Sequence, residues 1–123
     1  MKVIVAGLSK TGTKTMQKAL TDLGYNVYDA MEHYENHYKQ WNKILDVGGT
    51  TKDFRKMYEN VDAVTDIPAC AYWDLIHKAF PDAKVRIRRY KLNRPSQQRA
   101  KFSGQMVNLI KPSKTFPNYI LIK

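Results

Sequence analysis

A short loop with two glycines, set between an apolar run and a helical pattern, constrains this chain more than any other feature. The loop reads Gly7-Leu8-Ser9-Lys10-Thr11-Gly12-Thr13-Lys14-Thr15 and directly follows the apolar residues 3–6. Glycines let a chain turn tightly as it leaves a buried strand, and the first N–H groups of the helix that follows attract an anion. The sequence therefore predicts a phosphate-binding loop at the start of a helix.

The positions of the lysines distinguish between two kinds of phosphate loop. The common nucleoside-triphosphate loop, G-x-x-x-x-G-K-[ST], has its Lys directly after the second Gly. In this chain Thr13 occupies that position and Lys10 precedes Thr11-Gly12. Lys14 comes one residue later, about 100° further around a helix. This order favours a different phosphorylated ligand, with a small P-loop nucleotide kinase or NTPase as the alternative.

Apolar periodicity indicates an α/β chain in which strands and helices alternate. It predicts strands over 3–6, 25–28, 61–65 and just after 80–83, with helices over 13–23, after a cap at Asp29, beyond Gly48-Gly49 and from Pro68. This order implies a parallel sheet with right-handed crossovers, and ligands bind at the carboxyl ends of such strands. We expect Lys10 and Asp66 to lie at that edge.

The loop and several later stretches resemble the sulfotransferases. Lys10-Thr11-Gly12-Thr13 resembles their 5′-phosphosulfate loop, P-K-S-G-T-T, and more closely the loop G-L-P-[RK]-T-G-T-x-S of a divergent sulfotransferase-like family. Residues 20–25, 61–69, 80–85 and the helix containing Trp41 extend the resemblance over about residues 3–85. It implies a P-loop-type three-layer fold, the donor 3′-phosphoadenosine 5′-phosphosulfate (PAPS), and metal-free transfer of a sulfuryl group to a hydroxyl or amine of a small-molecule acceptor.

The chemistry of this transfer suggests roles for individual residues. Negative charge develops on the leaving phosphate oxygen, so a fixed cation beside it stabilises the transition state, and Lys10 is the candidate. Asp66 is the candidate general base that takes the acceptor's proton. Two alternatives remain for Asp66: it caps a helix, or, in the triphosphate alternative, it binds magnesium. Backbone and hydroxyl donors to the 5′-phosphate are expected from Thr11, Gly12, Thr13, Lys14 and Thr15.

The charge distribution divides the chain into two segments. Residues 1–85 hold eleven Lys or Arg and eleven Asp or Glu, whereas residues 86–123 hold ten Lys or Arg and no acid, so the formal net charge of +10 belongs to the second segment. We predict a sulfotransferase-like segment over 1–85 and a basic tail of irregular structure over 86–123. Because the charge is confined to one segment, it weighs against specific nucleic-acid binding by the whole protein. A truncated, non-enzymatic product with an anion-binding tail is a further alternative.

The resemblance weakens after residue 85. The family continues there with a strand ending in Arg and a helix bearing Ser, which together hold the donor's 3′-phosphate. Arg88 and Ser96 have the spacing of that pair, so the resemblance implies them as donor ligands. The rest of the family's domain has no counterpart, and we therefore expect an incomplete fold and little transferase activity from this chain by itself.

Histidines and the cysteine suggest no metal or disulfide chemistry. His33 and His37 lie four apart on a predicted helix, but no third ligand accompanies them, so we predict two solvent-facing histidines and no metal. The single cysteine, Cys70, allows no internal disulfide and indicates a small buried residue in a reducing compartment. No apolar run approaches the length of a membrane span or signal-peptide core, which predicts a cytoplasmic protein without membrane attachment.

Overall fold

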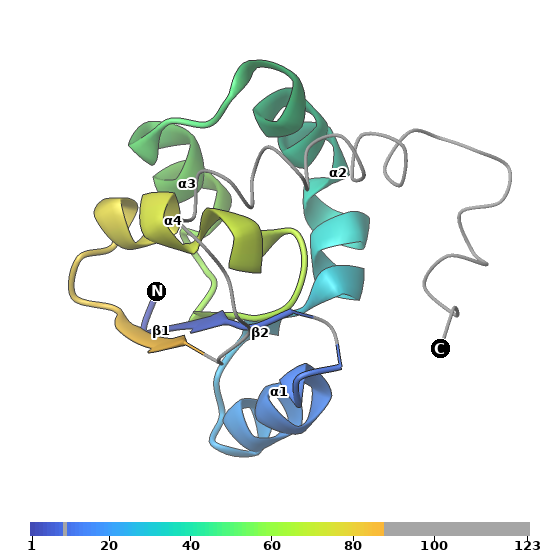
Figure 1. The fold of residues 1–123 in the computed structure, drawn as a ribbon. Helices are drawn as coiled ribbons and strands as arrows, with labels where there is room; N and C mark the ends of the chain where they lie inside the picture. Colours follow the sequence, from blue (N-terminus) through green and yellow to red (C-terminus); the bar gives the residue numbers. More distant parts are fainter. Residues whose placement is uncertain (9, 88–123) are drawn as a thin grey trace, which may run out of the picture.

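A parallel four-stranded sheet forms the centre of the structure, a computed structural model that describes residues 1–8 and 10–87. The strands β1 (Val3–Ala6), β2 (Val27–Tyr28), β3 (Ala63–Val64) and β4 (Lys84–Ile87) lie in the order β2-β3-β1-β4. The helices are α1 (Thr13–Asp22), α2 (Ala30–Val47), α3 (Thr51–Met57) and α4 (Trp73–Ala79), the last preceded by the 3₁₀ turn η1 (Ala69–Tyr72) (Figure 1). The predicted α/β class and parallel sheet are confirmed.

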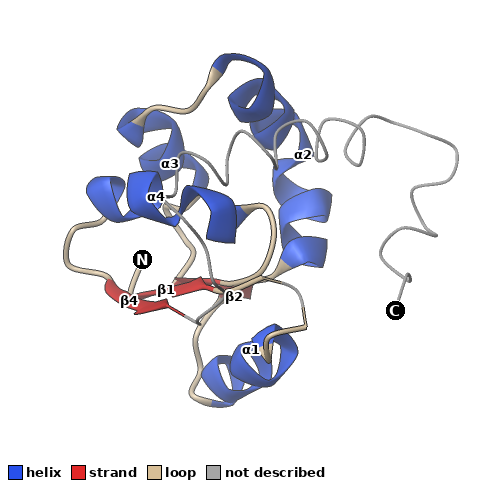
Figure 2. Ribbon diagram, viewed as in Figure 1, coloured by secondary structure: helices blue, strands red, loops and turns tan. Residues whose placement is uncertain are grey.

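The helices cover both faces of the sheet. Figure 2 shows α1 on one face and α2, α3 and α4 on the other. The strand order explains this, because the connection from β1 to β2 runs across the sheet in one direction and the later connections run back. Right-handed crossovers that run in opposite directions place their helices on opposite faces. The chain thus adopts the three-layer arrangement that the resemblance implies.

Successive side chains of a strand point to opposite faces of the sheet and contribute to two hydrophobic clusters, one on each face. Ile4 and Val64 belong to the larger cluster, under α2, α3 and α4, whereas Val5 and Ala63 belong to the smaller cluster against α1. The larger cluster also holds Trp41 and Phe54, whose side chains are almost fully buried. Burying an apolar side chain such as Phe54 stabilises the fold by roughly 1.5–3 kcal/mol, so this cluster fixes the helices that follow β2 and β3.

Two of the helices begin at complete capping boxes. Asp29 caps α2, as predicted, and Glu32 completes its box; Thr50 and Asp53 form the same arrangement at α3. In a capping box two side chains satisfy backbone N–H groups that the helix itself leaves unpaired. The starts of α2 and α3 are therefore closed by side chains of their own helices.

Several elements differ from the prediction in length or burial. Strands β2 and β3 are shorter than 25–28 and 61–65, because pairing begins where the carbonyl of Asn26 accepts the N–H groups of Asp62 and Ala63 (2.9 and 3.1 Å). The helix expected from Pro68 is divided into η1 and α4. Within the aromatic stripe of α2 Trp41 is buried, but Tyr34 is 37% exposed and lies outside the core.

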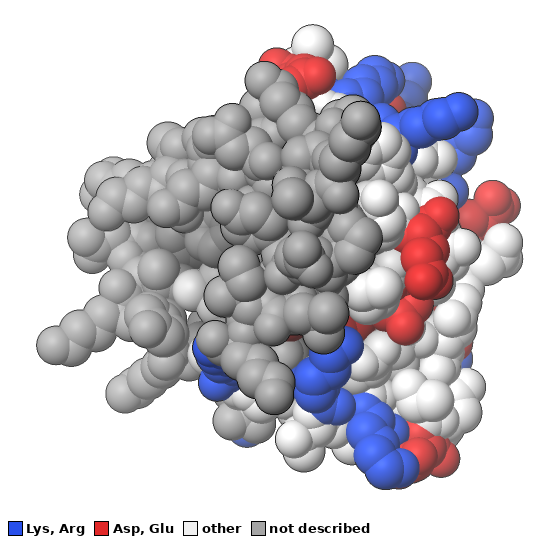
Figure 3. Space-filling model, turned by 90° about the vertical axis from the view of Figure 1, so that its right-hand side faces the viewer, with Lys and Arg blue, Asp and Glu red and all other residues white. Residues whose placement is uncertain are grey.

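The basic segment lies almost wholly outside the described residues. Strand β4 continues to Ile87, and residues 88–123 are not described, so the predictions for the tail, for Arg88 and for Ser96 stay predictions. On the face shown in Figure 3, side chains of both charge signs occur on the described part. Within residues 1–8 and 10–87, no helix combines the length and apolar character needed to cross a bilayer.

Candidate functional site

The candidate site lies at the carboxyl ends of β1 and β3, which are neighbours in the sheet. The chain leaves β1 toward α1 on one face and leaves β3 toward η1 and α4 on the other. Ligands of open α/β sheets bind at such a point, where adjacent connections diverge to opposite faces. Here the hydroxyl of Thr13 donates to Oδ2 of Asp66 at 3.0 Å, so the two loops meet as the sequence predicted.

Both loops hold a non-glycine residue in a left-handed backbone conformation. Lys10 has φ 66° and Asp66 has φ 61°, and they are the non-glycine residues with positive φ in the described part of the chain. Such a conformation costs an L-residue about 1–2 kcal/mol, and it is often found at ligand-binding sites. In the β1 loop, the N–H and hydroxyl of Thr11 both donate to the carbonyl of Leu8 (3.2 and 2.6 Å), which holds the turn closed.

Among the residues that the structure describes, no side chain caps the N-terminus of α1, which is therefore open, unlike those of α2 and α3. The helix begins after Gly12, whose φ of 86° favours glycine, and no side-chain cap or first-turn acid of α1 is seen among the described residues. The carbonyl of Gly12 accepts the N–H of Met16 at 3.0 Å, so the N–H groups of residues 13–15 precede the first intrahelical donor. An open helix start with the positive end of the dipole behind it fits a phosphate.

The hydroxyl groups of the loop contribute less than the sequence suggests. A hydroxyl has one proton, and those of Thr11 and Thr13 are donated to Leu8 and Asp66. In this conformation the backbone N–H groups at the start of α1 are therefore the donors that an anion there would meet first. Thr15 is exposed on the first turn of the same helix.

Asp66 is almost fully buried, with 5% of its surface exposed. Besides the Thr13 hydroxyl, its carboxylate accepts the N–H of Ile67 at 2.7 Å, and its main-chain carbonyl accepts the N–H of Cys70 at 2.8 Å. The turn η1 is capped by Pro68 without a side-chain bond. Asp66 thus bonds the backbone just before and within η1, and its carboxylate also contacts Thr13 at the start of α1.

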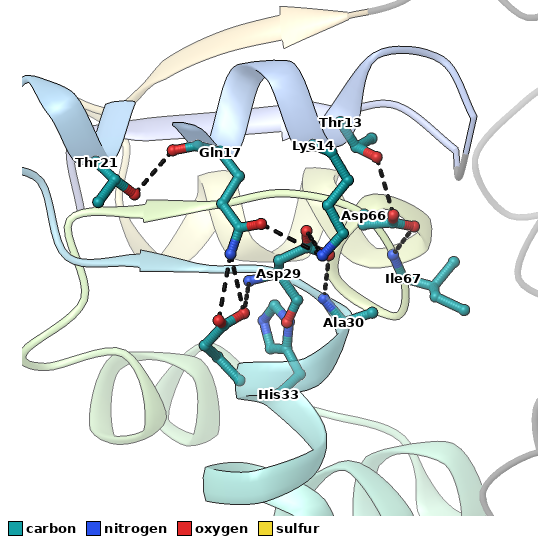
Figure 4. A network of polar contacts seen from close by, with 10 residues as sticks. Thr13, Lys14, Gln17, Thr21, Asp29, Ala30, His33, Asp66 and Ile67 are labelled. Carbon is teal, nitrogen blue, oxygen red and sulfur yellow. Dashed lines mark hydrogen bonds and ion pairs between the residues drawn. The ribbon is translucent and has the colours of Figure 1, made fainter. Parts of the chain in front are cut away.

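Lys14 forms an ion pair with Asp29 that the sequence did not predict. Its Nζ lies 2.7 Å from Oδ2 of Asp29, whose side chain is fully buried, and 3.3 Å from Oε1 of Gln17 (Figure 4). Gln17 in turn donates to both carboxylate oxygens of Glu32 (3.2 and 3.3 Å), and Glu32 accepts the N–H of Asp29 at 2.9 Å. Lys14 lies one residue further along α1 than the lysine of a triphosphate loop does. Its side chain therefore points toward the start of α2. The D-x-x-E spacing of Asp29 and Glu32 signals the capping box of α2 but not the contact with Lys14.

The prediction of two solvent-facing histidines is wrong for His33, which is 1% exposed. Its Nδ1 donates to the carbonyl of Asp29 at 2.7 Å, so the neutral Nε2 accepts the hydroxyl of Tyr58 at 2.8 Å. Burial lowers the pKa of His33 to about 3. His37, half-buried at a kink of α2, also has a pKa lowered by burial. Within the described residues no three His, Cys, Asp or Glu side chains are arranged to hold a metal.

Cys70 lies close to Asp66 and is buried in the described part of the chain. It is a small buried residue, as predicted. Burial, and after it the negative charge of Asp66, raises the pKa of the thiol to about 12. The thiolate is the reactive form of cysteine, so a raised pKa makes this thiol a poor nucleophile near neutral pH.

Comparison with known proteins identifies the family. The sulfotransferase domain family matches residues 2–89. The chain belongs to this family. It is also 37% identical over 94 residues to Ava biosynthesis cluster protein M of Aspergillus versicolor, an alignment that covers 69% of this chain and 36% of that protein. The sulfotransferase match includes the β1 loop, Asp29 and Asp66, while the chain spans little more than a third of this relative.

Proposed function

We propose that the β1 loop and the start of α1 bind PAPS, and that the protein transfers its sulfuryl group to a hydroxyl or amine of a small-molecule acceptor. The observation that carries this proposal is the open N-terminus of α1 beside Asp66. An uncapped helix start at the diverging ends of β1 and β3 is suited to a phosphate group. In a chain of the sulfotransferase family, the 5′-phosphosulfate of the donor is the phosphate to expect there.

Lys10 and the first N–H groups of α1 have distinct roles in this proposal. The N–H groups of residues 13–15 hold the 5′-phosphate. During transfer the bond from sulfur to the phosphate oxygen breaks, a bond from sulfur to the acceptor forms, and adenosine 3′,5′-bisphosphate leaves. Negative charge grows on the phosphate oxygen, and the exposed Lys10 supplies the positive charge that stabilises it. Arg88 and Ser96, outside the described residues, are proposed for the 3′-phosphate.

Asp66 is the proposed base that takes the acceptor's proton. Its carboxylate lies at the same edge as the loop and is fixed by the Ile67 N–H and the Thr13 hydroxyl. A base held in one orientation beside the reacting groups loses little conformational freedom in the transition state.

The arrangement of Lys14 supports this donor over a nucleoside triphosphate. A triphosphate loop needs a lysine that reaches the β- and γ-phosphates. Thr13 stands at that position, and the charge of Lys14 is paired with Asp29 on the α2 side. Within residues 1–8 and 10–87, the first turn of α1 thus holds no lysine placed as a triphosphate loop places it.

Calorimetry with two nucleotides tests the proposal. Adenosine 3′,5′-bisphosphate should bind more tightly than ADP, and a metal chelator should leave its affinity unchanged, because the phosphates are held by backbone N–H groups and lysine. Each titration is run with the 123-residue chain, with and without magnesium. A clear preference for magnesium-ATP would favour the nucleotide kinase or NTPase and contradict the sulfotransferase proposal.

Asp66→Asn tests the proposed base. The amide keeps the shape of the carboxylate but accepts no proton, so any sulfuryl transfer by the chain should slow by about 100-fold or more while nucleotide affinity stays nearly unchanged. Asp82→Asn, in the exposed turn before β4, is the matched control and should transfer at the parent rate. Equal turnover by the Asp66 variant would contradict its role as the base and return Asp66 to the capping interpretation.

A further inference from the structure

We propose that Asp29 determines the specificity of the phosphate loop by keeping the charge of Lys14 away from it. The inference rests on the proposed function, since it concerns which phosphate chains the same site accepts. With Lys14 paired to Asp29, the loop favours a ligand with little charge beyond its 5′-phosphate. With Lys14 released, it should also favour di- and triphosphates.

The position of Lys14 makes such a release possible. It is the second residue of α1, in the turn whose N–H groups face the proposed phosphate. Its side chain is 69% exposed, whereas the carboxylate of Asp29 is fully buried. A long, exposed lysine at a helix start can reach an anion bound there, so the contact with Asp29 decides where its charge is used.

Burial of Asp29 keeps the pair together. Removing the cation from a buried carboxylate is strongly unfavourable, because the remaining charge is neither solvated nor paired. Gln17 supports the arrangement from α1, accepting from Lys14 and donating to Glu32. An incoming phosphate chain must therefore compete with Asp29 for Lys14, and the extra charges of ADP or ATP gain little from this lysine.

The experiment compares the affinities of AMP, ADP and ATP for the 123-residue chain and three variants of it, with a chelator present. Asp29→Asn removes the charge and keeps a good helix cap, since Asn and Asp cap equally well. The parent chain should bind the three nucleotides with similar affinity. In Asp29→Asn the affinity for ATP relative to AMP should rise about tenfold, since a free lysine attracts the added phosphates.

The two remaining variants show whether the change comes from Lys14. Lys14→Gln combined with Asp29→Asn replaces the ion pair by an amide pair, and it should restore the similar affinities of the parent chain. Asp22→Asn removes the exposed partner of Lys18 on the same helix, a pair with an Nζ–Oδ2 distance of 2.9 Å, and should change nothing. Thermal unfolding of each variant verifies that it is folded.

Each outcome decides the proposal. An unchanged ATP-to-AMP ratio in folded Asp29→Asn would overturn it, as would a raised ratio that persists in the double variant. If Asp29→Asn does not fold, the double variant provides the test. Loss of AMP binding in the double variant would make Lys14 a direct phosphate ligand and would overturn the proposal. Failure of the parent chain to bind any adenosine nucleotide would instead refute the proposed function, and this inference with it.

Discussion

Replacing Lys10 by Ala should weaken the binding of adenosine 3′,5′-bisphosphate by about tenfold to a hundredfold, the range for a charged hydrogen bond. Lys10 lies in the loop that follows β1, whereas the charge of Lys14 is paired with the buried carboxylate of Asp29. Any sulfuryl transfer should fall further, by about 10²- to 10³-fold, because the negative charge on the leaving oxygen is larger in the transition state than in the ground state. Calorimetry and a transfer assay measure the two effects.

Two control variants show whether a loss at Lys10 is due to its charge. Lys18→Ala removes an exposed lysine of α1 that pairs with Asp22, and it should bind the nucleotide as the parent chain does. Lys10→Gly removes the charge and also relieves the left-handed strain at φ 66°, so it should lose affinity as Lys10→Ala does while gaining stability. An unchanged affinity in both Lys10 variants would make this residue an ordinary surface lysine.

The parts of the site that the sequence predicts are those set by local rules. Glycines after an apolar run and before a helical pattern define the turn from β1 into α1, and Asp29 is followed by Glu32 at capping-box spacing. The order of strands and helices implies a parallel sheet, which brings Asp66 to the same edge as the loop. Local conformation and topology together were enough to place Asp66 beside the start of α1.

The parts that the sequence does not predict depend on which side chains meet in space. Helical periodicity gives the direction of Lys14 around α1, but not that Asp29 lies there at the end of β2. His33 is similar, because an imidazole suits either solvent or a buried polar pair. Its burial follows from Tyr58, which comes from the end of α3 and supplies a hydroxyl to Nε2.

Acid should unfold the protein through His33, which is neutral in the folded state. Its pKa falls from 6.5 to about 3 on folding, so the unfolded chain binds a proton between these values that the folded chain does not. The contribution of His33 to the free energy of unfolding is therefore fully present above about pH 6.5. It falls by about 1.4 kcal/mol per pH unit as the pH drops toward 3. The total loss, about 5 kcal/mol, is comparable with the whole stability of a small domain.

Urea unfolding at a series of pH values, followed by circular dichroism, measures this dependence. His33→Gln keeps a donor and an acceptor but cannot titrate, so it should be less stable than the parent at neutral pH and lose less stability on acidification, by about one proton. His77→Gln, on α4, is the matched control for the substitution itself. Burial also lowers the pKa of His37, which adds to the acid sensitivity of both chains and cancels in their difference. The same steepness in the parent and in His33→Gln would show that His33 is already protonated in the folded protein, and that its bond to Tyr58 is not the one described.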